Sequence, residues 1–305
     1  QVAEFGFGRS EAPCERIDGL PRMDDVVSQP LPGHTVEALL VRFQLVQARM
    51  FVGLAHRPLA DLLRPTNLDD VVGQDHLLKP GAPLRNMLDQ GAVSSLILWG
   101  PPGCGKTTLA RLIARQSGLH FEQISAIFSG VADLRKVFDA ARIRMTNGQR
   151  TLLFVDEIHR FNKAQQDAFL PVVEDGTIIL IGATTENPSF EVNSALLSRC
   201  QVYTLNALSN EAIQELMLRA IQQDHFLKQR FIQIEEFDAL LQFAAGDARK
   251  ALNLLDLIAS TFEADVENII TNAIVVRVAQ QNIARYDKSG EQHYDRSEEH
   301  TSELQ

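Results

Sequence analysis

The sequence lacks any long apolar run. None of its apolar stretches reaches the ~18–20 residues that a membrane-spanning helix needs. Residues 1–30 also carry several charges, from Glu4 to Asp18, which would interrupt the apolar core of a secretory signal peptide. We therefore expect a cytoplasmic protein without a membrane partner.

Cysteine is scarce as well. The chain has three cysteines, Cys14, Cys104 and Cys200, and they form neither a C-x-x-C pair nor an even disulfide framework. This spacing excludes a structural zinc site and fits a compartment that keeps thiols reduced.

The chain has fewer basic than acidic residues. The 29 Lys and Arg face 39 Asp and Glu, which gives a net charge of −10. Such a chain does not coat nucleic acid by bulk neutralisation of phosphates, although a local basic patch can still bind it. With 305 residues, 45% of them hydrophobic, the chain is long and apolar enough for about two globular domains.

The two ends of the sequence lack the regular pattern of strands and helices that the middle shows. Residues 1–49, before Met50, show little periodicity and several prolines, so we expect an unassigned stretch that is either non-native or a poorly ordered extension. Arg296–Gln305 resembles the translation of a sequencing adapter. We therefore expect residues 287–305 to be a truncated tail ending in a processing scar, with the native sequence continuing past Asp295.

The middle alternates between strand-like and helix-like segments. The apolar runs Leu96–Trp99, Leu152–Val155 and Ile178–Ile181 have strand length, and Thr108–Ser117 and Val131–Met145 have helical patterns. This alternation predicts an α/β fold with a parallel sheet covered by helices on both faces.

After Leu208 the pattern becomes helical. Ser209–Gln223 and Asp247–Ser260 place apolar residues at helical spacing. We predict a nucleotide-binding domain over residues 50–208 and a small all-helical lid domain over residues 209–286.

One segment has the pattern of a phosphate-binding loop. Gly100–Thr107 satisfies G-x-x-x-x-G-K-[ST], directly after a predicted strand and before a predicted helix. The backbone amides of such a loop surround phosphates, the lysine contacts the β- and γ-phosphates, and the hydroxyl binds Mg²⁺. The predicted ATP-binding residues here are Gly100, Pro101, Pro102, Gly103, Cys104, Gly105, Lys106, Thr107 and Thr108, with Thr107 also a metal ligand.

Two carboxylates end the next apolar strand. Asp156 can hold Mg²⁺ through its water shell, and Glu157 can reach the water that attacks the γ-phosphate. A kinase of this fold would not need a water-activating acid there, so the pair favours hydrolysis.

Hydroxyl groups end the third strand. Thr184 and Thr185 follow Ile178–Ile181, where a side chain could reach the γ-phosphate. We predict Thr185 rather than Thr184 as the catalytic contact. The alternative is an ordinary hydrogen-bonded turn.

Together these motifs resemble the AAA+ ATPases of the clamp-loader clade. Further support comes from Ser198–Cys200 and from Gly246–Asn253, which reads GDARKALN. Asp156–Pro171 and Ile181–Glu191, with its ENPSF segment, are similar to the replication-associated recombination protein A family, bacterial relatives of Werner helicase-interacting protein. The resemblance covers roughly Pro58 to Asp295.

The resemblance implies further site residues. Arg199 would be an arginine finger offered to a neighbouring subunit, and Arg249 the sensor-2 arginine of the lid. Both side chains are suited to binding phosphate oxygens, because the guanidinium group is always charged and can donate two hydrogen bonds at once. The residues expected to border the adenine are Arg64, Val72, Gly73 and Gln74.

The resemblance also implies partners. The resemblance implies that the full-length protein is a homo-oligomer, a tetramer, that binds single-stranded DNA ends or forks beside replication proteins and the nucleoid. His159, Arg160 and Lys163 could face a DNA channel or form a solvated helix face. A clamp-loader subunit, a RuvB-like branch-migration motor and a non-catalytic nucleotide-sensing scaffold remain alternatives.

Overall fold

The computed structural model describes residues 58–281. Our expectations for residues 1–49 and 287–305 concern parts of the chain outside these residues. Within the described part, no helix combines the length and apolar character needed to cross a membrane.

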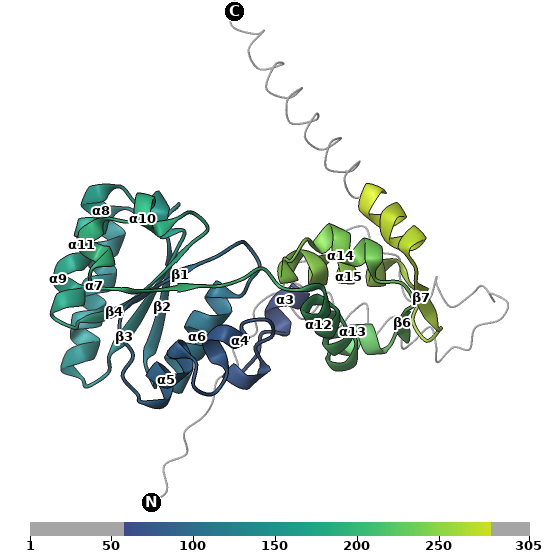
Figure 1. The fold of residues 1–305 in the computed structure, drawn as a ribbon, viewed down its shortest axis with the longest axis horizontal. Helices are drawn as coiled ribbons and strands as arrows, with labels where there is room; N and C mark the ends of the chain where they lie inside the picture. Colours follow the sequence, from purple (N-terminus) through teal and green to yellow (C-terminus); the bar gives the residue numbers. More distant parts are fainter. Residues whose placement is uncertain (1–57, 282–305) are drawn as a thin grey trace, which may run out of the picture. The chain divides into compact units, whose positions relative to one another are not determined.

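The sheet has five parallel strands in the order β2-β3-β4-β1-β5 (Figure 1). The predicted apolar strands form its buried centre, whereas β2 and β5 are partly exposed edge strands that mix polar with apolar residues. Such short mixed sequences give no clear strand signal, which explains why they are absent from the prediction. The strands are β1 (Leu96–Trp99), β2 (His120–Ser125), β3 (Thr151–Asp156), β4 (Ile178–Thr184) and β5 (Gln201–Thr204).

Helices cover both faces of the sheet, as the alternating pattern predicts. Leu96 and Leu98 of β1 pack into one core with α4, α5 and α6, whereas Ile97 packs into the other with α7, α9 and α11. The helices of this part are η1 (Leu68–Asp70), α4 (Asp75–Leu78), α5 (Pro83–Asp89), α6 (Lys106–Gln116), α7 (Val131–Thr146), η2 (Ile158–Arg160), α8 (Lys163–Asp167), α9 (Phe169–Glu174), α10 (Pro188–Glu191) and α11 (Ser194–Leu197).

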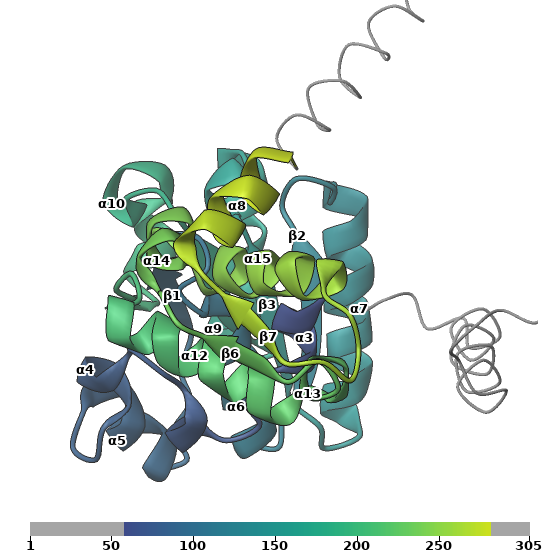
Figure 2. The same ribbon diagram turned by 90° about the vertical axis from the view of Figure 1, so that its right-hand side faces the viewer.

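The lid region follows Leu208 and has its own core (Figure 2). It contains α12 (Asn210–Gln223), α13 (His225–Lys228), α14 (Asp238–Ala244), α15 (Ala248–Thr261) and a helical segment at residues 272–281. The prediction of an all-helical lid is wrong in one respect, because β6 (Ile232–Ile234) and β7 (Asn268–Ile270) pair in parallel. Strands of three residues are too short to show a period of two, and Ile232 and Ile270 look like helical core residues in the sequence.

The helix α3 (Leu59–Leu62) precedes the sheet in sequence but packs with the lid. Its buried Leu59 joins the lid core, and Leu63 and Val72 pack against the same core. The segment before the sheet therefore contributes Leu59 to the lid core and Leu68 to the core of the sheet.

Candidate nucleotide site

The loop between β1 and α6 has the strand–loop–helix setting expected of a phosphate-binding loop. Gly105, with a φ of 102°, precedes α6 and turns the chain into the helix. The buried Lys106 donates hydrogen bonds from Nζ to the carbonyl oxygens of Gly100 (2.7 Å) and Pro101 (2.9 Å). Because the first turn of α6 has no acidic side chain, the positive end of the helix dipole is left for an anion.

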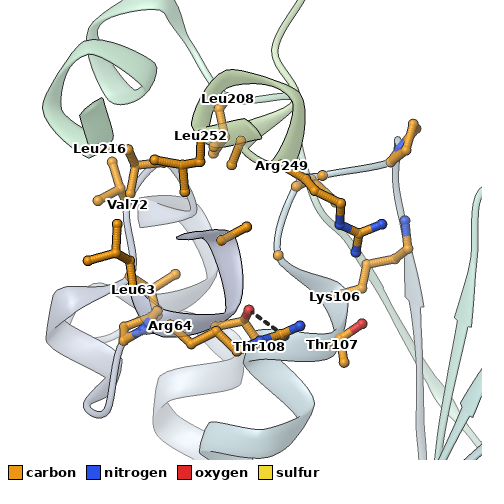
Figure 3. A pocket seen from close by; sticks show the side chains of 18 of the residues that line it. Leu63, Arg64, Val72, Lys106, Thr107, Thr108, Leu208, Leu216, Arg249 and Leu252 are labelled. Carbon is orange, nitrogen blue, oxygen red and sulfur yellow. Dashed lines mark hydrogen bonds between the residues drawn. The ribbon is translucent and has the colours of Figure 1, made fainter. Parts of the chain in front are cut away.

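A cavity of about 690 Å³ opens beside this loop (Figure 3). Its volume is in the range of small-molecule sites. Side chains from the loop, the sheet, the segment before the sheet and the lid all contribute to its wall. The predicted site residues that line it are Arg64, Val72, Pro102, Gly103, Cys104, Gly105, Lys106, Thr107, Thr108, Asp156, Glu157, Thr185 and Arg249.

The two carboxylates lie where β3 ends. Asp156 is the last residue of β3, and Glu157 follows with a φ of 56°, in the left-handed region. A residue other than glycine in this region is strained by about 1–3 kcal/mol, and such residues cluster at functional sites. Both side chains open on the cavity wall.

The two threonines at the end of β4 take different positions. Thr184 is fully buried, and its Oγ1 accepts a hydrogen bond from Glu186 N at 3.0 Å. Thr185 lines the cavity. The geometry is therefore compatible with a phosphate contact from Thr185 and not from Thr184.

The lid contributes the first turn of α15. Asp247 caps this helix, since its Oδ1 accepts hydrogen bonds from Arg249 N (2.8 Å) and Lys250 N (3.1 Å). Figure 3 shows the Arg249 guanidinium directed toward Lys106 across the cavity. Two cations thus face the space beside the loop.

The comparisons with known proteins match this architecture. Residues 96–208 match the ATPase family associated with various cellular activities (AAA), and residues 228–297 match the AAA C-terminal domain. The chain belongs to the AAA ATPase family.

Within this family the chain is similar to replication-associated recombination protein A. It is 47% identical to the Escherichia coli K12 protein over 249 residues, which are 78% of this chain and 55% of that protein. It is 46% identical to the ATPase WRNIP1 of Dictyostelium discoideum over 202 residues, which are 66% of this chain and 23% of that protein. The chain thus spans about half the length of the curated bacterial relatives it matches.

A solved structure of the Thermotoga maritima RuvB Holliday junction branch migration motor is similar in fold. Its TM-score is 0.58 at 27% sequence identity, over 72% of each chain. The AAA fold of this chain is therefore supported by sequence and by structure.

Four predicted nucleotide contacts of the AAA domain are not part of the cavity wall. Gly73 and Gln74 do not line the cavity, and neither do Gly100 and Pro101, whose carbonyl groups hold Lys106. The buried Gln74 side chain instead donates to the carbonyl oxygens of Cys104 (3.3 Å) and Asn206 (2.8 Å). Gln74 therefore joins the phosphate-binding loop to the segment that leads into the lid.

Arg199 lies outside the cavity. Its guanidinium forms an ion pair with Glu174, with Nε 2.7 Å from Oε1, and donates to Ala195 O at 2.6 Å. The structure thus does not bring Arg199 to the nucleotide site of its own chain, which is compatible with a role toward a neighbour.

The two cysteines among the described residues are not activated. Burial raises the pKa of the Cys104 thiol, and the nearby Lys106 ammonium opposes this only in part. Burial raises the pKa of Cys200 to about 12. The small, buried Cys104 is therefore a packing residue of the loop and not a nucleophile.

The oxygen donors in the cavity fit Mg²⁺. Thr107 and Asp156 both line it, and residues 58–281 contain no cluster of three or more His, Cys, Asp or Glu that could hold a metal. Mg²⁺ usually binds through one or two protein oxygens together with substrate phosphates and water. The donor set suits a cation that is shared with a nucleotide.

Apart from Val72 and the loop residues, the sequence prediction does not include the apolar residues of the cavity wall. These residues include Leu63, Leu208, Leu216 and Leu252, which come from three separate segments. In the sequence, Leu216 and Leu252 have the spacing of helix core residues, so their exposure to a cavity has no local signal.

Proposed function

We propose that this chain binds ATP with Mg²⁺ and hydrolyses it, as the ATPase part of a protein that maintains stalled replication forks and acts in recombination. The observation that supports the proposal is a single cavity whose wall carries Lys106, Glu157 and Arg249. We take residues 50–208 as the nucleotide-binding domain and residues 209–286 as its lid.

The phosphates would lie against the loop at the start of α6. There the Lys106 ammonium and the loop amides would bind the β- and γ-phosphates, and Arg249 would neutralise charge from the lid side. Thr107 and Asp156 would hold the Mg²⁺, which supplies charge neutralisation on the phosphate oxygens when bound. Leu63, Leu216 and Leu252 offer an apolar surface for the base.

Glu157 would act on the attacking water. Its carboxylate can accept a proton from a water held near the γ-phosphate, while the Thr185 hydroxyl orients the water or the phosphate. The leaving group is ADP, and the products are ADP and inorganic phosphate. The chain needs no covalent intermediate for this reaction.

A complete site would need a second subunit. Arg199 cannot serve its own cavity in the described arrangement, and an arginine finger supplied by a neighbour contributes about 10³–10⁵ in rate in related enzymes. We therefore propose a homo-oligomer, a tetramer in the full-length protein.

The DNA role is proposed from the relatives. Their names describe replication-associated recombination, and this chain shares 46–47% of its aligned residues with several of them. We propose single-stranded ends or forks as the DNA partner, in the cytoplasm beside the nucleoid and replication proteins. A branch-migration motor is a second candidate, favoured by the fold similarity to RuvB.

Phosphate release from ATP tests the proposal. It is measured without DNA and with single-stranded DNA, a fork or a four-way junction, for the wild type and for Lys106→Ala. Lys79→Ala, an exposed lysine paired with Asp75, is the matched control. We expect Mg²⁺-dependent release that Lys106→Ala abolishes and Lys79→Ala leaves unchanged, with stimulation by ends or forks.

The possible outcomes separate the candidates. Stimulation by the four-way junction alone would favour the branch-migration motor. Phosphate release that is equal in the wild type and in Lys106→Ala would contradict the proposed ATPase.

A further inference from the structure

The cavity carboxylate Glu157 has a partner behind it. His159 Nε2 lies 3.3 Å from Glu157 Oε2, and His159 Nδ1 lies 3.0 Å from Thr184 Oγ1. The His159 side chain is only 11% exposed, and Thr184 is fully buried. The imidazole is therefore largely shielded from solvent within the chain, unlike the exposed Arg160 and Lys163.

These contacts connect two neighbouring strands at the edge of the site. Glu157 follows β3, and Thr184 ends β4, which pairs with β3 in parallel. Glu157 and Thr185 line the cavity, whereas His159 and Thr184 do not. Each cavity-facing residue thus has a neighbour behind the wall, and His159 joins the two.

Packing holds the imidazole in this position. His159 belongs to η2, whose first residue, Ile158, is fully buried. A side chain at Gly182 of β4 would come within 2.8 Å of Ile158 Cδ1, so a glycine there lets η2 lie close to the strand. The position of His159 is therefore set by core packing and not by a flexible surface turn.

The hydrogen-bond partners restrict the protonation of His159. If the Thr184 hydroxyl donates to Nδ1, a neutral imidazole carries its proton on Nε2 and can donate it to Glu157. If Thr184 donates instead to Glu186 O, at 3.1 Å, Nδ1 must be the donor to Oγ1. A neutral ring would then present the lone pair of Nε2 to the carboxylate, which is unfavourable. For a neutral ring the first arrangement is therefore the favourable one, and it places a hydrogen on Nε2, directed at Glu157.

We propose that His159 is a positioning residue for the hydrolysis reaction, and this rests on the function proposed above. It binds one oxygen of Glu157 and leaves the other free to accept a proton from the attacking water. Through Thr184 it also ties Glu157 to the turn that carries Thr185. Both groups that would act on the water are thereby held in one geometry.

Substitutions of His159 separate positioning from folding. A misplacement of about 1 Å can cost on the order of 10² in rate, so we expect His159→Ala to lower kcat about 10- to 100-fold with ATP affinity unchanged. Glutamine can bring an amide N–H near the Nε2 position, whereas asparagine reaches only the Nδ1 side. The expected order of kcat is wild type, His159→Gln, then His159→Asn close to His159→Ala.

The chain offers a matched control. His120 Nε2 also lies 3.3 Å from a glutamate, Glu122 Oε2, but at the amino end of β2, away from the cavity. We expect His120→Ala to leave kcat unchanged. A double-mutant cycle adds a second check, because His159→Ala should have little further effect on the residual rate of Glu157→Gln.

The imidazole ¹⁵N chemical shifts, assigned with His159→Gln, test the inference without any reading of activity. We expect Nε2 to be protonated. A neutral ring protonated only on Nδ1 would overturn the inference, as would wild-type or higher kcat in His159→Ala. A wild type that releases no phosphate would instead overturn the proposed ATPase, and the ¹⁵N shifts would still test the contact.

Discussion

Gly103 in the phosphate-binding loop and Asp247 at the start of α15 are in direct contact. A methyl group on Gly103 would lie 1.8 Å from Asp247 Oδ1, and Ala248 N donates to Gly103 O at 3.4 Å. Gly103 also has a φ of 71°, which L side chains rarely adopt. The loop therefore needs glycine both for its own conformation and for its contact with the lid.

The first prediction concerns this contact. We expect Gly103→Ala to lower ATP affinity at least about tenfold, because the methyl group must displace Asp247 and with it the start of α15. Gly118→Ala is the matched control, with a φ of 64° but no atom near the added methyl group. Titration with a fluorescent ATP analogue measures both variants.

The Gly118→Ala control isolates the cost of placing a side chain on a backbone with a positive φ. Gly118→Ala should lower the free energy of unfolding by about 1–2 kcal/mol and leave ATP affinity unchanged. Equal ATP affinity in Gly103→Ala and the wild type would mean that the loop and the lid are not coupled at this point.

The second prediction concerns the cap of α15. We expect Asp247→Ala to lower the free energy of unfolding by about 1 kcal/mol, since Arg249 N and Lys250 N lose their acceptor. ATP affinity should fall as well, because the capped turn carries Arg249 into the cavity. Urea denaturation and ATP titration measure the two effects.

Asp224→Ala provides the comparison for the cap. Asp224 caps α13 through Leu227 N at 3.0 Å and does not itself line the cavity. Asp224→Ala should lower the free energy of unfolding by a similar amount, without any loss of ATP affinity. If both substitutions weaken ATP binding equally, the effect of Asp247→Ala on binding is explained by the loss of stability alone.

The third prediction concerns the thiols. With a pKa of about 12, Cys200 is a thiolate in only about one molecule in 10⁴ at pH 8. We expect iodoacetamide to alkylate the peptide that contains Cys200 far more slowly in the native protein than in urea. Cys104, whose pKa is also raised, should behave alike. Alkylation of native Cys200 at the rate seen in urea would show that its pKa is not raised in the folded protein.

The fourth prediction concerns the shared site. We expect Arg199→Ala to bind ATP normally and to hydrolyse it slowly, and wild-type activity per molecule to rise with protein concentration as subunits associate. Mixing Arg199→Ala with Lys106→Ala should recover activity, because the second chain can supply its arginine to the site of the first. Arg142→Ala, an exposed arginine paired with Asp139, is the control.

One combined result would contradict a nucleotide site that is shared between subunits. Activity that is independent of concentration, with no recovery in the mixture, would indicate a site that is complete within one chain.

Local sequence signals account for part of the fold. β1, β3 and β4 are predictable because continuous apolar runs mark strands that are buried on both faces. The edge strands β2 and β5 and the short pair β6–β7 depend on partners far away in the sequence, so local patterns do not mark them.

The residues of the candidate site also fall into those that local sequence signals predict and those that depend on distant partners. The loop residue Lys106, the carboxylates and the Asp247 cap follow from motifs whose spacing is set by local backbone geometry. The roles of Gln74, which bonds to Asn206 across 132 positions, and of His159, which reaches Thr184, depend on tertiary contacts. A motif can place these residues near a site but cannot give their partners.

The most direct test of the proposed ATPase compares ATP binding with phosphate release in two variants. Lys106 would contact the phosphates of bound ATP, whereas Glu157 would act only on the attacking water. We expect Lys106→Ala to lose ATP binding, and Glu157→Gln to bind ATP like the wild type but to lose phosphate release. The exposed Glu263→Gln is the control and should keep both activities. Phosphate release by Glu157→Gln at the wild-type rate would contradict the account.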